Sequence, residues 1–331
     1  MNLKIKNNIK KILLKCPGAV IRLFYQLYNR AKYPEMMEKK TSYGEENREI
    51  TIYIIRPRTD GVEGLMALLM GVIKNLNYAE KKRYISVVDF KNYHTQYADG
   101  DSENINVWDY FFEPVSDFSL SAAYRSKKVV LSGLNAILHC DEYLNQRMDK
   151  NSLEKARGFV RKRIRYSKLT NNRVKSEIND MDLQETLGLY IRGTDYTKLK
   201  PAGHPIQPST EQAIRKADEF LKQYNLKKVF LVTEDYDIYI KIKEHYGNRL
   251  RIVSFDSFIS GYSGDNYLSL NNGDLSQLAN TAIDRGMNYL VKIIILSKCK
   301  CFVGGNTCGS WAAQVLSDGY EDSYVFDLGR Y

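Results

Sequence analysis

Polar side chains gather at three places in the second half of the sequence, each directly after a short apolar run. These are Tyr190-Ile-Arg-Gly-Thr-Asp-Tyr196, Thr233-Glu-Asp235 and Gly304-Gly-Asn-Thr-Cys-Gly-Ser310. An arginine at a strand end can grip a phosphate with two parallel N–H bonds. Carboxylates accept bonds from ribose hydroxyls or a base edge, and a glycine-rich helix start exposes amides to an anion. Each pattern alone also occurs as an ordinary cap or turn. Together they predict a nucleoside diphosphate site.

The apolar pattern around these clusters predicts strands that alternate with helices. We expect strands at 187–191, 228–232, 250–254, 301–303 and 324–327, and helices at 210–224, 236–246, 275–298 and 310–316. The helix at 210 has a cap in Ser209-Thr-Glu-Gln212. This alternation implies an α/β fold with a parallel sheet and helices on both of its faces. In such sheets ligands bind beyond the carboxyl ends of the strands.

The first half shows the same pattern more weakly. A strand is expected at 49–55, a loop at 56–64, a helix at 65–76 and a second strand at 84–88, which makes a βαβ unit. A further strand is expected within 127–134. Residues 141–180 are strongly charged and read as helical. They include the basic run 157–165, a pattern that is more often a solvated helix face than a binding site.

Length and composition bound the class of protein. The chain has 331 residues, of which 44% are hydrophobic and 27% charged, so it is neither disordered nor a multi-spanning membrane protein. The length predicts two domains. We expect an N-terminal segment over 1–48, a first domain over 49–180 and a second over 181–331. The net charge of +10 suits an anionic partner, and equally a basic surface on an ordinary enzyme.

The cysteines do not indicate a disulfide framework or a metal site. There are five of them, an odd number in a long chain, so a reducing compartment is expected. Cys299, Cys301 and Cys308 lie close together in the sequence but lack the spacing of a zinc module, and no histidine lies nearby. We therefore expect no bound metal and no cofactor.

The N-terminal segment is basic and amphipathic. Its first 30 residues hold seven Lys and Arg residues and no acidic residue, and Pro17 and Arg22 interrupt the apolar run. It lacks the apolar core and cleavage site of a signal peptide. Such a segment can rest on an anionic leaflet or pack against its own domain, and the sequence does not separate the two. The expected location is cytoplasmic, with a peripheral membrane contact as the alternative.

The three clusters also resemble, in the same order, the motifs of the fucosyltransferase superfamily. Ile191-Arg-Gly-Thr-Asp-Tyr196 with His204-Pro-Ile206 is similar to its first motif, and Thr233-Glu-Asp235 to its second. The stretch from Ile295 to Trp311 is similar to its third. This group includes α-1,2-, α-1,6- and nodulation fucosyltransferases and protein O-fucosyltransferases. The resemblance covers about residues 185–331. It implies a GT-B fold, in which two Rossmann-like domains face each other across a cleft and the second holds a nucleotide sugar.

The resemblance also implies roles for individual residues. Arg192 aligns with the arginine that contacts the β-phosphate, and Asp235 falls where an acidic residue meets the nucleoside. The residues that align with the phosphate binders at the helix start are Asn306, Thr307 and Ser310. The family's first motif often has a histidine and two arginines, whereas this chain has Tyr190 and Gly193. That difference concerns the guanine contact and leaves the donor base open.

The chemistry implied is metal-independent, inverting transfer, most simply of fucose from GDP-fucose to a glycan of a surface polysaccharide or glycolipid. Arg192 would stabilise the departing diphosphate, and a general base would deprotonate the acceptor. Glu63 is the candidate base, with Asp60 and Glu113 as rivals; Glu63 is equally explained as a helix N-terminal charge. The loop 257–273 would be a lid, an acceptor site or an ordinary surface loop.

The predicted catalytic residues are thus Glu63 and Arg192. The predicted substrate-binding residues are Tyr190, Thr194, Asp195, His204, Thr233, Glu234, Asp235, Asp256, Asn306, Thr307 and Ser310. The partners expected are a nucleotide-sugar donor and a glycan acceptor, not a nucleic acid. Two alternatives stay open: transfer from another nucleotide sugar, and a non-enzymatic binder of polyanions or membrane surfaces with a degenerate nucleotide site.

Overall fold

The computed structural model of the protein describes residues 20, 23, 27–28, 30–31, 34–57, 61–100, 104–179, 181–262, 264 and 266–331. Most of the basic N-terminal segment lies outside these residues, as do Cys16 and Asp60. The expectations for these residues therefore stay predictions. The chain divides into two compact units, Met1–Asn145 and Gln146–Tyr331. Among the described residues, no helix is long and apolar enough to cross a membrane.

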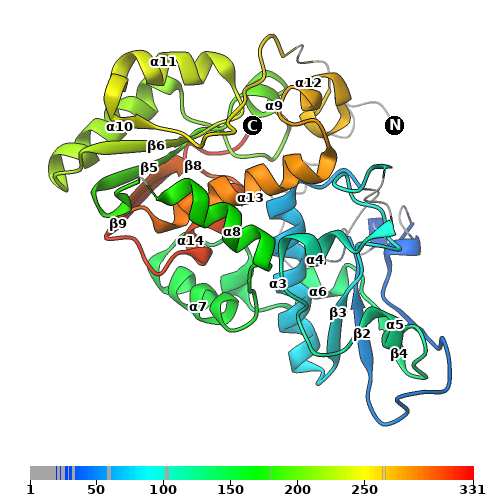
Figure 1. The fold of residues 1–331 in the computed structure, drawn as a ribbon. Coiled ribbons are helices and arrows are strands. Elements are labelled where there is room, and N and C mark those ends of the chain that lie inside the picture. Colours follow the sequence, from blue (N-terminus) through cyan, green and yellow to red (C-terminus); the bar gives the residue numbers. More distant parts are fainter. Residues whose placement is uncertain are drawn as a thin grey trace. The chain divides into compact units, whose positions relative to one another are not determined.

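The first unit is built on a four-stranded sheet (Figure 1). Its strands, in the spatial order β1-β4-β2-β3, are β1 Lys39–Thr41, β4 Val129–Leu131, β2 Ile52–Ile55 and β3 Ile85–Val88. The pairs β2–β3 and β2–β4 are parallel and β1–β4 is antiparallel. The helices of this unit are α3 Leu65–Lys81, α4 Val107–Phe111, α5 Leu120–Ala123 and α6 Asn135–His139.

Strand β2 is buried on both faces, which explains its unbroken apolar sequence. Ile52 and Ile54 belong to the hydrophobic cluster that includes Ala123 of α5. Tyr53 points to the opposite face, where its hydroxyl donates to Asn75 of α3 at 2.8 Å. The βαβ unit expected from the sequence is therefore confirmed, with β2, α3 and β3 in the predicted order.

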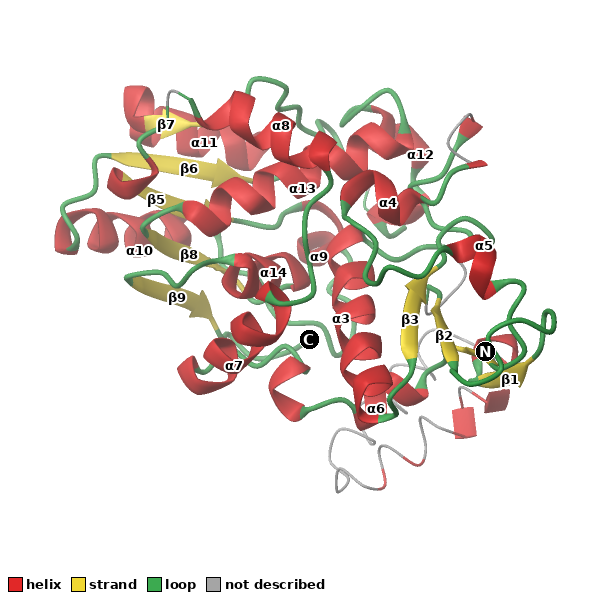
Figure 2. Cartoon of the chain, turned by 60° about the horizontal axis from the view of Figure 1, so that its bottom comes forward, coloured by secondary structure: helices red, strands yellow, loops and turns green. Residues whose placement is uncertain are grey.

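The second unit contains a five-stranded, fully parallel sheet (Figure 2). Its strands, in the spatial order β7-β6-β5-β8-β9, are β7 Leu250–Arg251, β6 Lys228–Val232, β5 Thr186–Tyr190, β8 Cys301–Gly305 and β9 Asp322–Phe326. Its helices are α7 Lys150–Arg161, α8 Lys168–Ile178, α9 Thr194–Lys198, α10 Thr210–Gln223, α11 Tyr236–Tyr246, α12 Asn272–Ser276, α13 Ala282–Lys298 and α14 Cys308–Leu316.

Helices cover both faces of this sheet. Residues of α10 and α11 share one hydrophobic cluster with β5, β6, β8 and β9. Helix α13 packs against β5 and β6 and also against α14, while α7 packs on α14 and α8 on α13. The α/β fold class and the parallel sheet with helices on both faces are thus confirmed. The capping box predicted at Ser209 and Gln212 is present as well.

A helix and the domain boundary differ from expectation, and β7 is shorter than the strand expected at 250–254. The helix expected over 275–298 is broken into α12 and α13, because the Thr281 hydroxyl accepts the Asp284 amide at 3.1 Å and starts a new helix at Ala282. The units divide after residue 145 rather than after 180, because α7 and α8 pack on helices of the second sheet. Both helices therefore belong to the second unit.

Candidate nucleotide site

The strand order of the second sheet defines where a ligand would bind. Numbered along the chain, its strands run in the order 3-2-1-4-5, so the order reverses between β5 and β8. Open α/β sheets bind ligands at this topological switch point, outside the carboxyl ends of the strands. The segment that follows β5 holds Arg192, and the one that follows β8 opens helix α14. Two of the three predicted clusters therefore flank the switch point.

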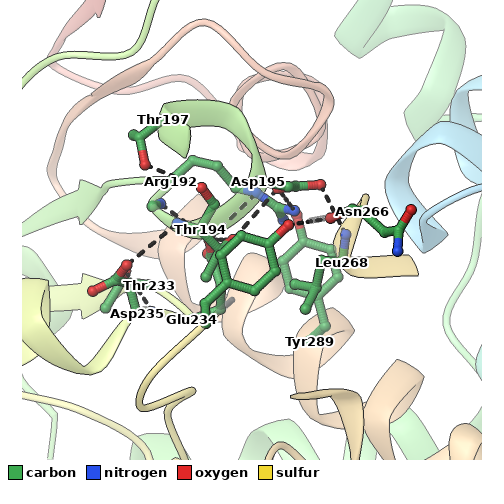
Figure 3. A network of polar contacts seen from close by, with 12 residues as sticks. Arg192, Thr194, Asp195, Thr197, Thr233, Glu234, Asp235, Asn266, Leu268 and Tyr289 are labelled. Atoms are coloured by element: carbon green, nitrogen blue, oxygen red, sulfur yellow. Dashed lines mark hydrogen bonds and ion pairs between the residues drawn. The ribbon is translucent and has the colours of Figure 1, made fainter. Parts of the chain in front are cut away.

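Arg192 is held by two carboxylates (Figure 3). Its Nη2 donates to Asp195 Oδ1 at 3.0 Å, and its Nε lies 3.4 Å from Glu234 Oε1. Its side chain is only 21% exposed. Burial by itself lowers the pKa of the guanidinium, but the charges of Glu234 and Asp195 outweigh that effect and raise it well above its usual value. Arg192 is therefore a fixed cation, with its planar group oriented by the protein.

Glu234 and Asp235 hold the loop that carries Arg192. Glu234 Oε1 accepts bonds from the Gly193 amide at 3.0 Å and the Thr194 hydroxyl at 2.8 Å, and Asp235 Oδ2 accepts the Thr194 amide at 3.2 Å. Thr194 has a φ of +43°, a strained conformation for a β-branched residue. The strain is thus balanced by three polar contacts. Backbone strain that the surrounding contacts hold in place is common at binding sites.

Asp235 has a second structural role and explains the glycine at position 193. Its Oδ1 caps α11 by accepting the amides of Asp237 and Ile238 at 3.0 and 3.1 Å, and the Thr233 hydroxyl accepts the Asp235 amide at 3.2 Å. A Cβ at Gly193 would lie 2.4 Å from Asp235 Oδ2. No side chain fits there. Thr233, Glu234 and Asp235 thus support the Arg192 loop from β6, and a contact between Asp235 and a nucleoside stays a prediction.

Helix α14 begins with a self-contained cap. Thr307 Oγ1 accepts the Ser310 amide at 3.1 Å, and the Ser310 hydroxyl donates to the Gly305 carbonyl. Ser310 is fully buried. Asn306 accepts bonds from Gln207 at its carbonyl and from Gln146 at its side chain, both at 3.3 Å. Ser310 is therefore placed to hold the turn. A helix start exposes backbone amides that can bind an anion, and phosphate binding by Asn306, Thr307 and Ser310 stays a prediction.

Tyrosines connect the Arg192 loop with the start of α14. The hydroxyls of Tyr190 and Tyr289, which lies on α13, are 3.0 Å apart. Tyr190 also hydrogen-bonds with Thr307, and burial raises its pKa, so the hydroxyl stays neutral. The Arg192 guanidinium lies 5.2 Å from the centre of the Tyr196 ring. Tyr190 was expected from the sequence, whereas Tyr289 was not, because nothing in a regular helical pattern marks it.

Gly309 shows how closely these tyrosines approach α14. A Cβ there would lie 2.5 Å from Tyr289 Oη and 2.7 Å from Tyr190 Oη. We expect Gly309→Ala to destabilise the protein by about 1–3 kcal/mol, because the buried Tyr190 ring and the partly buried Tyr289 ring would have to move. Denaturant unfolding measures the loss. Tyr289→Phe removes the nearer oxygen, so the double variant should lose less than the sum of the two single variants. Additive losses would contradict the close approach.

His204 lies near the same loop. Its ring centre is 5.4 Å from that of Tyr196 and 6.4 Å from that of Tyr267. Leu268, the residue after Tyr267, donates its amide hydrogen to Asp195 Oδ2 at 3.3 Å. The segment around 267 therefore contacts the carboxylate that orients Arg192. Tyr267 is a half-exposed aromatic residue beside the site, and nothing in the sequence pattern of the loop 257–273 marks it.

Asp256 is not part of this cluster. Its Oδ1 accepts a bond from Lys292 Nζ of α13 at 2.8 Å, and the two side chains are 1% and 10% exposed. Burial raises the pKa of Asp256, and the Lys292 charge opposes that rise. The carboxylate is thus committed to an internal ion pair and separate from the Arg192 network.

The candidate bases lie in the first unit. Glu63 is nearly buried, just before α3, and Glu113 is exposed. Both belong to a different compact unit from Arg192. Their partnership with the second unit therefore stays a prediction. In the described part of the chain, no group of three or more His, Cys, Asp and Glu residues could hold a metal ion.

The sequence matches no protein-family model and no curated protein. Solved structures are similar to it. NodZ α-1,6-fucosyltransferase co-crystallised with GDP is 13% identical with a TM-score of 0.48, covering 81% of this chain and 93% of the other. Se-Met fucosyltransferase NodZ from Bradyrhizobium is 13% identical with a TM-score of 0.48, covering 85% and 96%. The apo form of POFUT1 is 10% identical with a TM-score of 0.49, covering 86% and 99%.

Proposed function

We propose that this protein is an inverting, metal-independent glycosyltransferase that transfers fucose from GDP-fucose to a glycan acceptor in surface polysaccharide or glycolipid synthesis. One observation carries the proposal. Arg192, oriented by Asp195 and Glu234, and the start of α14 flank the switch point of a parallel sheet. A guanidinium and a helix N-terminus on either side of that point suit a diphosphate.

The same groups would serve the chemistry. In sugar transfer the departing nucleoside diphosphate gains negative charge, which a fixed cation and oriented amides stabilise without reorganising. Asp195 takes one N–H of the Arg192 fork, and Glu234 lies beside Nε. The remaining N–H groups of the guanidinium are the donors proposed for the β-phosphate. The two carboxylates keep the fork from turning away.

A general base completes the proposed mechanism. An acceptor hydroxyl attacks the anomeric carbon as the base removes its proton, and the diphosphate leaves. We propose Glu63 for that role, with Asp60 and Glu113 as the alternatives. Activity assays of Glu63→Gln, Asp60→Asn and Glu113→Gln separate them, because removal of the true base should lower kcat while the affinity for the nucleotide is unchanged.

Transfer from another nucleotide sugar is a second candidate, favoured by one observation. Gly193 stands where the resembling family often has a second arginine, and Asp235 leaves no room for a side chain there. The base of the nucleotide would then be recognised by other groups. This candidate keeps the diphosphate site and changes the donor.

Nucleotide binding tests both candidates. Titration calorimetry with GDP, UDP, ADP and CMP, each with Mg²⁺ and with a chelator, should show binding of GDP above the others and no dependence on metal. Preference for another diphosphate would move the donor assignment and keep the site. If none of the nucleotides binds, the enzymatic proposal fails and the non-enzymatic alternative gains. Binding that requires Mg²⁺ would contradict the metal-independent mechanism.

A further inference from the structure

Apart from the basic N-terminal segment, most of the excess positive charge lies in two helices outside the candidate nucleotide site. Residues 146–179 hold eleven Lys and Arg residues against three Asp and Glu residues, a net charge of +8 in a chain of net charge +10. They form α7 and α8 and the turn between them. These helices pack on α14 and α13, so they lie one layer further from the sheet (Figure 1). Their outer sides carry the charge.

Some of these cations have structural roles. Arg157 is half-buried and donates to the Gln314 carbonyl at 2.8 Å, and Arg161 pairs with Asp318 at 2.9 Å. The Arg163 guanidinium lies 3.9 Å from the centre of the Phe159 ring. The first two contacts hold α7 against α14 and the turn that follows it, and all three explain part of the basic run. They do not explain the cations that point outward.

Five of the other eight cations form what we call the junction surface: Lys155, Lys162, Arg165, Lys168 and Lys175, together with Leu169. All six are exposed, and none of the five cations forms an ion pair with a described residue. Lys155 and Lys162 are two helical turns apart, as are Lys168 and Lys175, so each pair lies on one side of its helix. Like charges gathered without counter-ions repel one another, and an anionic partner would relieve that repulsion.

An apolar residue within the junction surface indicates which partner. Leu169 is 45% exposed and follows Lys168 at the start of α8. It is the one exposed large apolar residue between 146 and 179, all of which the structure describes, and no exposed aromatic ring accompanies it. Binding of single-stranded nucleic acid would call for aromatic rings that stack on bases. Cations around a protruding leucine fit a lipid surface, where headgroups meet the cations and acyl chains the leucine.

We propose that the junction surface docks the protein on an anionic lipid leaflet, with Leu169 inserted at the boundary between headgroups and acyl chains. The contact is electrostatic and reversible, and it does not depend on the proposed nucleotide site. It would hold the second unit at a membrane independently of the N-terminal segment.

Co-sedimentation of the full-length protein with vesicles tests the proposal. We expect binding to phosphatidylcholine vesicles that contain about one third phosphatidylserine, and none to phosphatidylcholine alone. The Lys162→Gln/Arg165→Gln/Lys168→Gln variant should partition about a hundredfold less well, because each cation near an anionic leaflet contributes a roughly fivefold gain. Leu169→Ser should weaken binding by about tenfold and leave its salt dependence unchanged.

A matched variant controls for total charge. Arg215, Lys222 and Lys298 are exposed cations outside α7 and α8 and without an ion pair to a described residue. Replacing all three by glutamine removes the same charge and should leave vesicle binding nearly unchanged. Equal losses in the two triple variants, or no loss in the first, would overturn the proposal. So would binding of single-stranded RNA in the absence of vesicle binding. Calorimetry with GDP should give the same affinity in all these proteins, which separates this result from the nucleotide proposal.

Discussion

Replacing Arg192 by alanine is expected to lower sugar transfer by about a hundred- to a thousandfold, because the departing diphosphate loses an oriented cation. The affinity for GDP should fall as well. The loss follows from the geometry at the switch point, where the guanidinium is held by Asp195 and by Glu234. Single-turnover assays and calorimetry on the same preparation measure the two effects.

The variant also tests the carboxylates that hold the guanidinium. Without Arg192, Asp195 and Glu234 remain nearly buried beside each other, so the free energy of unfolding should fall by about 3 kcal/mol or more. Binding must therefore be measured well below the unfolding temperature. Arg192→Lys keeps the charge but loses the planar fork, and should recover stability better than transfer. Arg215→Ala on the exposed side of α10 is the neutral control. Wild-type GDP affinity in a folded Arg192→Ala protein would contradict the assignment.

Breaking the Asp256–Lys292 pair should produce the largest loss of stability. Each of Asp256→Leu and Lys292→Met leaves a single charge in a buried position, which costs about 3–5 kcal/mol. The double variant removes both charges and should return to within about 1 kcal/mol of the wild type. Urea unfolding of the four proteins forms a double-mutant cycle. A coupling energy near zero would show that the charges of Asp256 and Lys292 do not stabilise each other.

The same cycle separates a structural from a substrate-binding role for Asp256. If the residue only stabilises the fold, the double variant should bind GDP as the wild type does. A folded double variant that fails to bind would restore the role predicted from the sequence. The pH adds a signature. Burial raises the pKa of Asp256 in the folded state above its usual value of 3.8. The free energy of folding that this shift contributes is therefore present below pH 3.8 and is lost as the pH rises through the raised pKa. The double variant should lack that decline.

The sequence predicts the framework of the site because strand patterns and strand ends are local properties. The apolar runs before Arg192, Thr233 and Gly304 identify β5, β6 and β8, and their alternation with helices predicts a shared carboxyl edge. Side-chain direction is not local. Glu234 and Asp235 turn toward the Arg192 loop because residues 40 or 41 positions away offer them amides and a hydroxyl. No spacing rule encodes such a long-range match.

Asp256 and Tyr289 are two further residues whose contacts the sequence pattern does not predict. Asp256 follows the predicted strand 250–254 and therefore resembles a strand-end residue. However, β7 ends at Arg251, and the Asp256 carboxylate accepts a bond from Lys292. Tyr289 lies within a regular amphipathic helix, where its pattern indicates packing alone, yet its hydroxyl contacts Tyr190. Both outcomes depend on how α13 is placed across the sheet, which only the tertiary structure determines.

Helix α13 therefore contacts two separate parts of the second unit. Tyr289 and Lys292 are one turn apart on it, so one rigid element joins the Tyr190 hydroxyl at the switch point to the carboxylate that anchors the segment after β7. A translation of α13 would change both contacts. We therefore expect the segment around Asp256 and the end of β5 to move together. We therefore expect substitutions in that segment to affect the candidate nucleotide site without contacting it.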